Sequence, residues 1–266
     1  MARIIAVSNQ KGGVGKTTTA VSLSAALARA GHPTLLIDLD PQGNATSALG
    51  VARDEVANGS GELVLGLEPL TACTCATSQA KLELVPASPG LVGADVELVG
   101  LPNRERRLAF ALAAVPDSVD FVVIDCPPSL GMLTLNALVA ADGVLIPVQA
   151  EFHAMEGLGE LTRTIAAVRR SLNPRLTREG IVITMWDPRA NLCREVEQQV
   201  RGVFGREVFD TVVPRAVRVA EAPSYGKTIF QHDGGSKAAK AYAALAHEVV
   251  RRAIAAAKQP QQVQAG

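Results

Sequence analysis

The sequence begins with Arg3-Ile-Ile-Ala-Val-Ser-Asn9 and continues, after Gln10, with Lys11-Gly-Gly-Val-Gly-Lys-Thr-Thr18. The first segment is an apolar, β-rich run, and the second is rich in glycine and lysine. Because glycine has no Cβ, the backbone can curl and point its N–H groups at an anion held where the next helix starts. This order of strand, glycine-rich loop and helix predicts a phosphate-binding loop.

The residue types in the loop indicate what each position does. Lys16 is expected to reach the β- and γ-phosphates of a nucleotide, and the Thr17 hydroxyl is expected to bind Mg²⁺. Gln10 stands where the standard G-x-x-x-x-G-K-[ST] pattern has its first glycine, and Lys11 is an additional lysine. The predicted nucleotide-binding positions of the loop are Lys11, Gly12, Gly13, Val14, Gly15, Lys16, Thr17 and Thr18.

Two acidic segments follow later apolar runs. One is Asp38-Leu-Asp-Pro-Gln-Gly-Asn44, and the other ends the run Asp120-Phe-Val-Val-Ile-Asp125. Sites in α/β proteins lie at the carboxyl ends of the strands, so both segments are expected beside the phosphate loop. Asp40 is predicted to orient or deprotonate the attacking water, or to hold the Mg²⁺ shell, and Asp125 to support Mg²⁺ through water.

Apolar runs alternate with helical segments along the whole chain. This alternation predicts an α/β fold, a doubly wound and mostly parallel sheet with helices on both faces, in a single P-loop ATPase domain over residues 1–258. Residues 52–80 show weak periodicity, and the polar residues 259–266 are expected to form a disordered tail. The expected strands are 3–9, 34–38, 82–86, 120–125, 143–148, 180–186 and 208–213, and the expected helices are 16–30, 103–114, 130–140, 154–171, 190–204 and 236–257.

The composition agrees with such a fold and narrows the class of protein. Apolar residues make up 48% of the 266 residues but aromatic residues only 3%, so the core must consist of Ala, Val, Leu and Ile, as in parallel sheets under helices. The N-terminus lacks a signal pattern and no apolar stretch reaches ~18 residues, so we expect a cytoplasmic protein without membrane attachment. The four cysteines form no C-x-x-C pair, which favours reduced thiols over a zinc site.

The charges are divided unevenly between the two parts of the chain. Residues 1–159 contain 9 Lys and Arg against 16 Asp and Glu, whereas residues 160–266 contain 17 against 10. Such asymmetry indicates either a polyanion partner for the C-terminal part or ordinary solvated helix faces, and charge alone does not choose between them.

Several of these segments together resemble a known family. The glycine-rich loop, the segment Asp38–Asn44 and Ile124-Asp-Cys-Pro-Pro-Ser-Leu130 resemble the ParA/Soj chromosome-partitioning ATPases, which have a deviant Walker A motif and are related to MinD and the nitrogenase iron protein. The resemblance covers nearly the whole chain except about 52–80 and the tail. Its further segments are Ile146–Gln149, Glu156–Leu158, Thr184–Arg189, Val213–Arg218 and Glu221–Lys227.

The resemblance implies a catalytic role for three residues. Lys11 would reach across an ATP-sandwich homodimer to the partner's phosphates, Lys16 would bind phosphate, and Asp40 would activate water. Asp125 would be the Walker B acid. Met185 and Pro214 would line the adenine pocket.

The family also implies partners for the ATP-bound dimer. It would bind double-stranded DNA without sequence preference on the nucleoid, and a ParB/Spo0J-type centromere-binding protein would stimulate hydrolysis and release it. Arg189 and Arg218 would contact DNA phosphates. Further candidates, which could equally be solvated surface charges, are Lys227, Lys237, Lys240 and Arg251.

Two features depart from the relatives. Ala216 stands where family members often have asparagine, which puts a contact of that residue to adenine in doubt. The chain begins about two residues before its first strand, so we expect no N-terminal helix-turn-helix extension and no operator-specific binding.

Three other functions use the same loop. A MinD-like membrane ATPase would need a free amphipathic C-terminal helix, and Tyr242, Leu245, Val249 and Ile254 do form a stripe that could instead dock on the sheet. An iron–sulfur reductase would need cysteines shared across a dimer, a role that Cys126 fits poorly. A small-molecule kinase or ligase remains open on the sequence.

Overall fold

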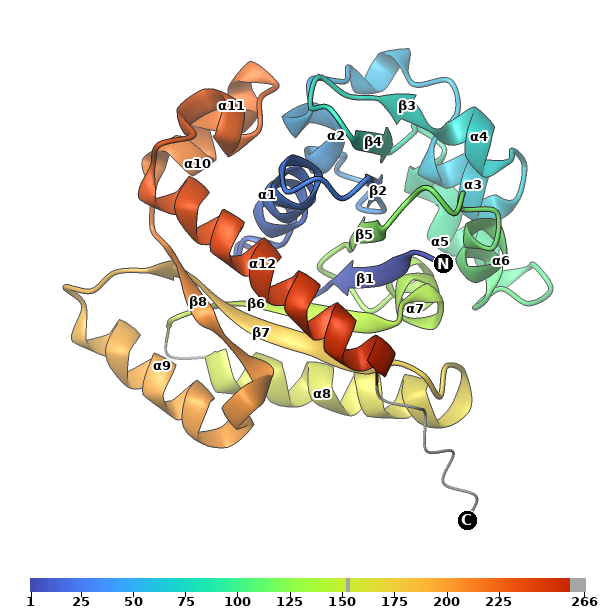
Figure 1. Cartoon of the computed structure of the whole chain (residues 1–266). Coiled ribbons are helices and arrows are strands. Elements are labelled where there is room, and N and C mark those ends of the chain that lie inside the picture. Colours follow the sequence, from blue (N-terminus) through green and yellow to red (C-terminus); the bar gives the residue numbers. More distant parts are fainter. Residues whose placement is uncertain (152–153, 259–266) are drawn as a thin grey trace.

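Eight strands form one sheet in the computed structural model, which describes residues 1–151 and 154–258. The order across the sheet is β3-β4-β2-β5-β1-β6-β7-β8, and all neighbouring strands are parallel except β3 and β4. The predicted mostly parallel, doubly wound sheet is therefore confirmed (Figure 1). The strands are β1 (Arg3–Val7), β2 (Thr34–Asp38), β3 (Cys75–Ala76), β4 (Leu82–Val85), β5 (Phe121–Asp125), β6 (Gly143–Gln149), β7 (Thr177–Trp186) and β8 (Val208–Pro214).

The central strands have the sequences that burial on both faces requires. Every residue of β2 and of β5 is buried. A strand covered by helices on both sides gains nothing from alternating polar residues, so both are continuous apolar runs that end in an aspartate. Each of these strands therefore delivers a carboxylate to the same edge of the sheet.

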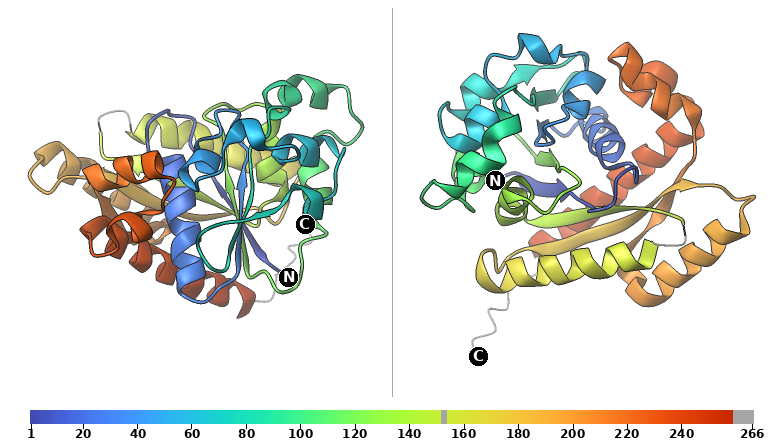
Figure 2. Two further views of the ribbon diagram at one scale, coloured as in Figure 1. Left: turned by 90° about the horizontal axis from the view of Figure 1, so that it is seen from above. Right: turned by 180° about the vertical axis from the view of Figure 1, so that it is seen from behind.

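Helices cover both faces of the sheet and divide the core in two. One apolar cluster lies under α3 to α9, and the other under α1, α2, α11 and α12. Figure 2 shows α8 and α12 on opposite sides of the sheet. The helices of the described residues are α1 (Lys16–Arg29), α2 (Asn44–Ala48), α3 (Ser60–Leu65), α4 (Leu70–Cys73), α5 (Leu91–Val99), α6 (Arg107–Leu112), α7 (Met132–Ala140), α8 (Ala154–Ser171), α9 (Asn191–Phe204), α10 (Val217–Glu221), α11 (Ile229–Asp233) and α12 (Lys237–Lys258), with 3₁₀ turns η1 (Arg53–Glu55), η2 (Gly205–Glu207) and η3 (Ala222–Tyr225).

Helix α1 packs on the sheet and against α12, which also contacts β8 directly. It starts after Gly15, whose φ of 85° is in the left-handed region that favours glycine, and it is followed by Gly31 with φ 103° and then Pro33. Its side chains from Thr19 to Ala28 are buried. The first turn of α1, which carries the loop lysine and threonines, is thus fixed by the core.

The C-terminal helix α12 docks on this layer. Tyr242, Leu245 and Val249 are at most 1% exposed, and each contributes about 1.5–3 kcal/mol through burial. Near its end Arg252 donates to the carbonyls of four residues between positions 179 and 208, and its guanidinium stacks over Phe209. The stripe predicted from the sequence therefore belongs to the core, except for the exposed Ile254.

Seven of the predicted strands and six of the predicted helices are present. The boundaries agree within three residues except at 103–114, where the helix covers only 107–112, because residues 101–106 form turns. The uncertain region 52–80 contains η1, α3, α4 and β3, and α2, α5, α10 and α11 were not predicted. The single domain remains a prediction, and the tail 259–266 lies outside the described residues. No helix of the described part of the chain is long and apolar enough to cross a membrane.

Candidate nucleotide site

The register of the three central strands brings the predicted segments together. Val7 of β1 pairs with Asp125 of β5, and Asp125 in turn pairs with Asp38 of β2. The loops that follow these residues leave the carboxyl edge of the sheet side by side, where α/β proteins bind ligands. The phosphate loop, the turn at Asp40 and the acid Asp125 therefore share one site.

The phosphate loop is held in shape by hydrogen bonds to strands β6 and β7. Asn9 donates its amide to the carbonyl of Pro147 at 2.8 Å and accepts from the backbone N–H of Lys11 at 3.0 Å. The Thr184 hydroxyl donates to the carbonyl of Val14 at 2.8 Å, and both residues are buried. The loop is thus preorganised, with space beside it, because no atom lies within 4 Å of a Cβ placed on Gly12 or Gly13.

Lys16 projects into the hollow of this loop. It is 7% exposed, and its Nζ donates to the carbonyl of Lys11 at 2.9 Å. Burial lowers the pKa of Lys16, and the nearby carboxylates of Asp125 and Asp40 oppose that change. The charge is therefore held inside the site, next to the acids, where a phosphate would sit.

Lys11 is arranged differently from Lys16. Its Nζ forms an ion pair with Glu151, which follows β6 at the same edge of the sheet. The Lys11 and Glu151 side chains are 36% and 35% exposed. Within this chain the extra lysine therefore points away from the hollow of its own loop and remains accessible from outside.

The acids of the site differ in their environments. Burial, which outweighs the hydrogen bonds from Thr46 and Asp40, raises the pKa of Asp38 to about 6. The hydroxyl and backbone N–H of Thr46 both donate to Asp38, at 2.6 and 2.7 Å. Asp40 is 6% exposed, and its carboxylate accepts from the N–H of Gln42 at 3.0 Å, which closes the turn after β2.

Asp125 is the acid of this site that receives the fewest hydrogen bonds from the described residues. Burial raises its pKa well above the usual range, the charge of Asp38 adds to this, and the nearby Thr17 hydroxyl opposes it. Both carboxylate oxygens are buried with no hydrogen bond of normal distance and angle to the described residues. An orphaned carboxylate beside a threonine hydroxyl suits a hard divalent cation that keeps some of its waters.

No cluster of three or more His, Cys, Asp or Glu in the described ranges could hold a metal ion by itself. That finding is compatible with Mg²⁺, because this ion is usually bound by one or two carboxylates together with waters and substrate phosphates. The donor set of Thr17, Asp125 and the neighbouring Asp40 fits that pattern.

A cavity of about 340 Å³ opens on the other side of the loop. Met185, with an unusual φ of 51°, and Pro214 line it, and these are the two positions that the resemblance implies for an adenine pocket. Ala216 also lines it, so the position that carries asparagine in many relatives does face this cavity. The other lining residues are Gly15, Thr18, Thr184, Val213, Arg215, Val217, Val219, Ala220 and Tyr242.

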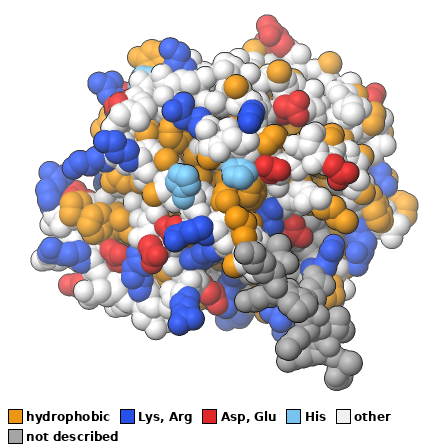
Figure 3. Space-filling model, in the orientation of Figure 1, with side chains coloured by type: hydrophobic (Ala, Val, Ile, Leu, Met, Phe, Trp, Pro, Cys, Tyr) orange, Lys and Arg blue, Asp and Glu red, His pale blue; other side chains and the backbone are white. Residues whose placement is uncertain are grey.

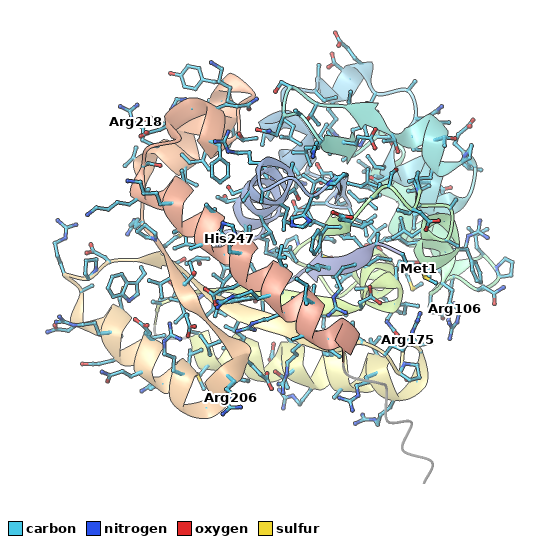
Figure 4. All side chains as sticks on the ribbon, in the orientation of Figure 1. Met1, Arg106, Arg175, Arg206, Arg218 and His247 are labelled. Carbon is cyan, nitrogen blue, oxygen red and sulfur yellow. The ribbon has the colours of Figure 1, made fainter. Side chains whose placement is uncertain are left out.

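The predicted DNA contacts are exposed and lie on the C-terminal part of the chain. Arg189 pairs with Asp187 through two nitrogens, at 3.1 and 2.9 Å, and this pairing lowers the pKa of Asp187 to about 2. Arg218 pairs with Glu221 at 3.0 Å. Figure 3 shows Lys and Arg side chains over the region of α9, α10 and α11, and Figure 4 shows Arg218 projecting from α10.

The remaining candidates separate into two groups. Lys237, Lys240 and Arg251 are exposed, and their spacing of three and eleven residues places them on one outward face of α12, together with the exposed His247 (Figure 4). Lys227 is exposed on the loop after η3, away from that face, and lines a second cavity beside α1 and α2.

The structure also weakens the alternative functions. The apolar stripe of α12 is committed to the core, so it does not form a free membrane-binding face. Cys126 is fully buried, and burial raises the pKa of its thiol far above the ordinary value, which is the opposite of what a shared cluster ligand needs.

Four residues of the site were not predicted to function: Asn9, Asp38, Thr46 and Glu151. Asp38 and Glu151 follow the same rule as Asp40 and Asp125, since each lies at or just after the carboxyl end of a parallel strand. The place of Asp38 and Glu151 at strand ends could therefore have indicated that they belong to the site. The roles of Asn9 and Thr46 depend on contacts with residues far away in the sequence and carry no local signal.

A strand, a phosphate loop and two strand-end acids in a parallel sheet define a P-loop nucleoside triphosphatase. A family model described as an AAA domain matches residues 2–178. The chain is 52% identical to the chromosome partitioning protein ParA of Myxococcus xanthus, over 94% of this chain and 88% of the relative. It is 53% identical to the chromosome-partitioning ATPase Soj of Thermus thermophilus, over 94% and 96%.

Among solved structures, the chain resembles cobyrinic acid a,c-diamide synthase of Mycobacterium smegmatis, crystallised with an ATP analogue and magnesium. The two are 38% identical with a TM-score of 0.85, over 98% of this chain and 99% of the other. The chain belongs to the ParA/Soj family of chromosome-partitioning ATPases, as the sequence predicted, and its activity is ATP hydrolysis.

Proposed function

We propose that this protein is an ATP-operated DNA-segregation switch in which Mg·ATP joins two copies, the pair binds DNA, and hydrolysis separates them. The observation that carries the proposal is the contrast between the two lysines of the loop. Lys16 is 7% exposed and serves its own site, whereas Lys11 lies at the rim with a third of its side chain exposed. A cation at the rim is available to the phosphates of a second copy.

The residues of each copy's own site would prepare one ATP for hydrolysis. Lys16 and the N–H groups of the loop bind the β- and γ-phosphates, and Met185 and Pro214 enclose the base. Thr17 and Asp125, with the neighbouring Asp40, would hold Mg²⁺, which would supply positive charge to the phosphates. Asp40, at the turn after β2, orients the attacking water and accepts its proton.

Lys11 of the opposite copy would convert nucleotide state into oligomeric state. Two triphosphates that face each other repel, and an ammonium donated by each copy offsets that repulsion. Once the γ-phosphate leaves, the lysine loses its partner and can return to Glu151, and the dimer separates. This cycle needs no residue outside the carboxyl edge of the sheet.

Dimer formation would set the affinity for DNA. Each phosphate that a Lys or Arg neutralises adds to affinity and makes binding more sensitive to salt. Arg189 and Arg218 are free to change partners, because both belong to exposed ion pairs, which solvent screens. Two linked basic faces bind one duplex far more tightly than one face does.

The names of the relatives support chromosome partitioning as the purpose of this switch. A centromere-bound partner of the ParB/Spo0J type would then trigger hydrolysis on the nucleoid. The chain supplies no evident arginine finger of its own, so turnover should be slow until that partner arrives.

Co-sedimentation with DNA tests the proposal. The chain is mixed with nonspecific double-stranded DNA, or with anionic vesicles, in ADP, in ATP or in a non-hydrolysable analogue. We expect retention on DNA with the analogue, loss of retention with ADP and no nucleotide-dependent retention on vesicles. Equal DNA binding in all three nucleotide states would contradict the switch, and nucleotide-dependent binding to vesicles would favour a membrane role.

A further inference from the structure

Two glycines join the catalytic turn to the basic C-terminal segment. Gly50 follows α2, and Gly226 follows η3. Their φ angles, 79° and 59°, are in the left-handed region. A Cβ placed on Gly226 would lie 2.7 Å from the Cα of Gly50, and one placed on Gly50 would lie 3.2 Å from the carbonyl oxygen of Gly226. The two backbones therefore meet at a distance that only glycine permits.

On one side of this contact, α2 is bonded directly to the nucleotide site. It begins at Asn44, immediately after the turn that contains Asp40, and Ser47 donates its hydroxyl to the carbonyl of Gly43 at 3.1 Å. Thr46 in the middle of α2 holds Asp38 with both its hydroxyl and its N–H. Because α2 has only five residues and ends two residues before Gly50, a shift of the backbone at Gly50 is expected to move the start of α2 as well.

On the other side, Gly226 belongs to the segment that carries Arg218 and Lys227. The N–H of Gly226 donates to the carbonyl of Pro223 at 3.0 Å, and the N–H of Lys227 donates to that of Ala222 at 3.2 Å. Glu221, the partner of Arg218, directly precedes η3. Segment 218–227 is thus a short, internally bonded unit, and it moves Gly226 when it moves.

The cavity between these units gives them room to move. It has a volume of about 320 Å³ and lies between the first turns of α1, helix α2 and the segment around η3. Thr17 and Thr18 of the phosphate loop line one wall, Asn44 and Ser47 line another, and Lys227 lies on the third.

We infer that Gly226 is a positioning residue for ATP hydrolysis, and that the Gly50–Gly226 contact transmits DNA binding on segment 218–227 to the turn that carries Asp40. The DNA part of the inference rests on the proposed function, whereas the effect on the turn concerns ATP hydrolysis alone. Coupling of this kind is reciprocal, so DNA must raise the affinity for the ATP state by the same factor by which that state raises the affinity for DNA.

Gly226→Ala tests the contact because its new Cβ would overlap the backbone of Gly50. A backbone atom cannot rotate away as a side chain would, so one of the two segments must move. The matched control is Gly31→Ala, which also places a Cβ at a left-handed φ of 103° but meets no atom within 4 Å. Both variants incur backbone strain of about 1 kcal/mol. Only Gly226→Ala is expected to push α2 and η3 apart.

The measurement is the dissociation constant of a fluorescent non-hydrolysable ATP analogue with and without nonspecific DNA, followed by turnover of ATP alone. For the parent chain and Gly31→Ala we expect DNA to tighten nucleotide binding by about 5- to 150-fold, the usual range for coupled sites. For Gly226→Ala we expect a ratio near 1. Its kcat without DNA should fall while KM changes little, because the phosphate loop is untouched and the turn is displaced.

The outcomes separate this inference from the proposed function. If DNA has no effect on nucleotide binding by the parent chain, the proposed DNA switch is wrong, and kcat of Gly226→Ala still decides whether Gly226 positions the turn. If the parent chain responds to DNA and Gly226→Ala responds equally with an unchanged kcat, the inference is overturned.

A second variant and a measurement on the parent chain test the inference if Gly226→Ala does not fold. Gly50→Ala meets the same contact from the opposite side with a milder overlap, and it should reproduce both effects. In the parent chain, DNA added to the analogue-bound state should slow hydrogen exchange of the amides at 40–50. Unchanged exchange there, despite DNA binding, would also overturn the inference.

Discussion

Glu151→Gln should strengthen the ATP-dependent dimer. In the structure the Lys11 ammonium is bound by Glu151 of the same copy. The proposed dimer needs that ammonium on the phosphates of the other copy, so the two contacts compete. Removing the negative charge of Glu151 weakens the internal contact and leaves the trans contact intact.

The size of the effect follows from the exposure of the pair. Because both side chains are about one-third exposed, solvent screens the pair, and it contributes about 0.2–1 kcal/mol, as surface ion pairs do. A dimer releases two such pairs, so the gain is about 0.4–2 kcal/mol. That range corresponds to a dimer dissociation constant lowered by about 2- to 30-fold.

Analytical ultracentrifugation with a saturating non-hydrolysable ATP analogue and Mg²⁺ measures this constant. Glu160→Gln, the same charge change at an exposed position of α8, is the control and should leave the constant unchanged. Affinity of the monomer for the analogue should also stay the same, which separates release of Lys11 from a general gain in positive charge. A Glu151→Gln dimer that is equally stable or weaker would refute the competition.

Three other changes test the remaining parts of the site. Lys16→Ala should abolish ATP binding in a calorimetric titration, because a buried cation in the hollow of the loop is lost; tight binding by this variant would remove the loop from the mechanism. Asp125→Asn should raise the stability of the nucleotide-free chain by about 1–3 kcal/mol at pH 7.5, since burial raises the pKa of Asp125 and thus penalises its ionised form. That penalty is absent below the unfolded pKa of about 3.9 and grows as the pH rises toward the folded pKa, so thermal melts should coincide near pH 4 and diverge above it, and a gain that is constant with pH would point to another cause. Arg218→Glu should lose DNA in co-sedimentation while still forming the dimer, and undiminished retention would show that α10 is not part of the DNA-binding face.

The parts of the fold that could be predicted from the sequence are those with a strong local pattern. β2 and β5 are uninterrupted apolar runs because both of their faces are covered, and α8 has an amphipathic pattern over its full length. Short elements such as α2 and β3 lack that pattern. They owe their form to contacts made elsewhere, for example the bonds between Thr46 and Asp38.

The residues of the candidate site also differ in whether a local sequence pattern indicates them. Lys16, Thr17 and Asp125 could be predicted because loop chemistry and strand ends indicate them directly. The internal partner of Lys11 could not, because the ion pair joins residues 140 positions apart in the sequence. The state of that lysine depends on tertiary structure, although its identity is plain in the sequence.

Both lysines of the loop have partners within the chain. Lys16 donates to the carbonyl of Lys11, and Lys11 pairs with Glu151. In the proposed cycle, an incoming γ-phosphate would compete with the Lys11 carbonyl for Lys16 and so release a restraint on the backbone of Lys11. Binding of ATP in cis would then precede the trans contact of Lys11, because the first step removes a restraint on the second. A protein that used Lys11 only as a second phosphate ligand of its own site would gain nothing from Glu151, and the presence of that acid at the rim favours a lysine that is held back until a second copy arrives.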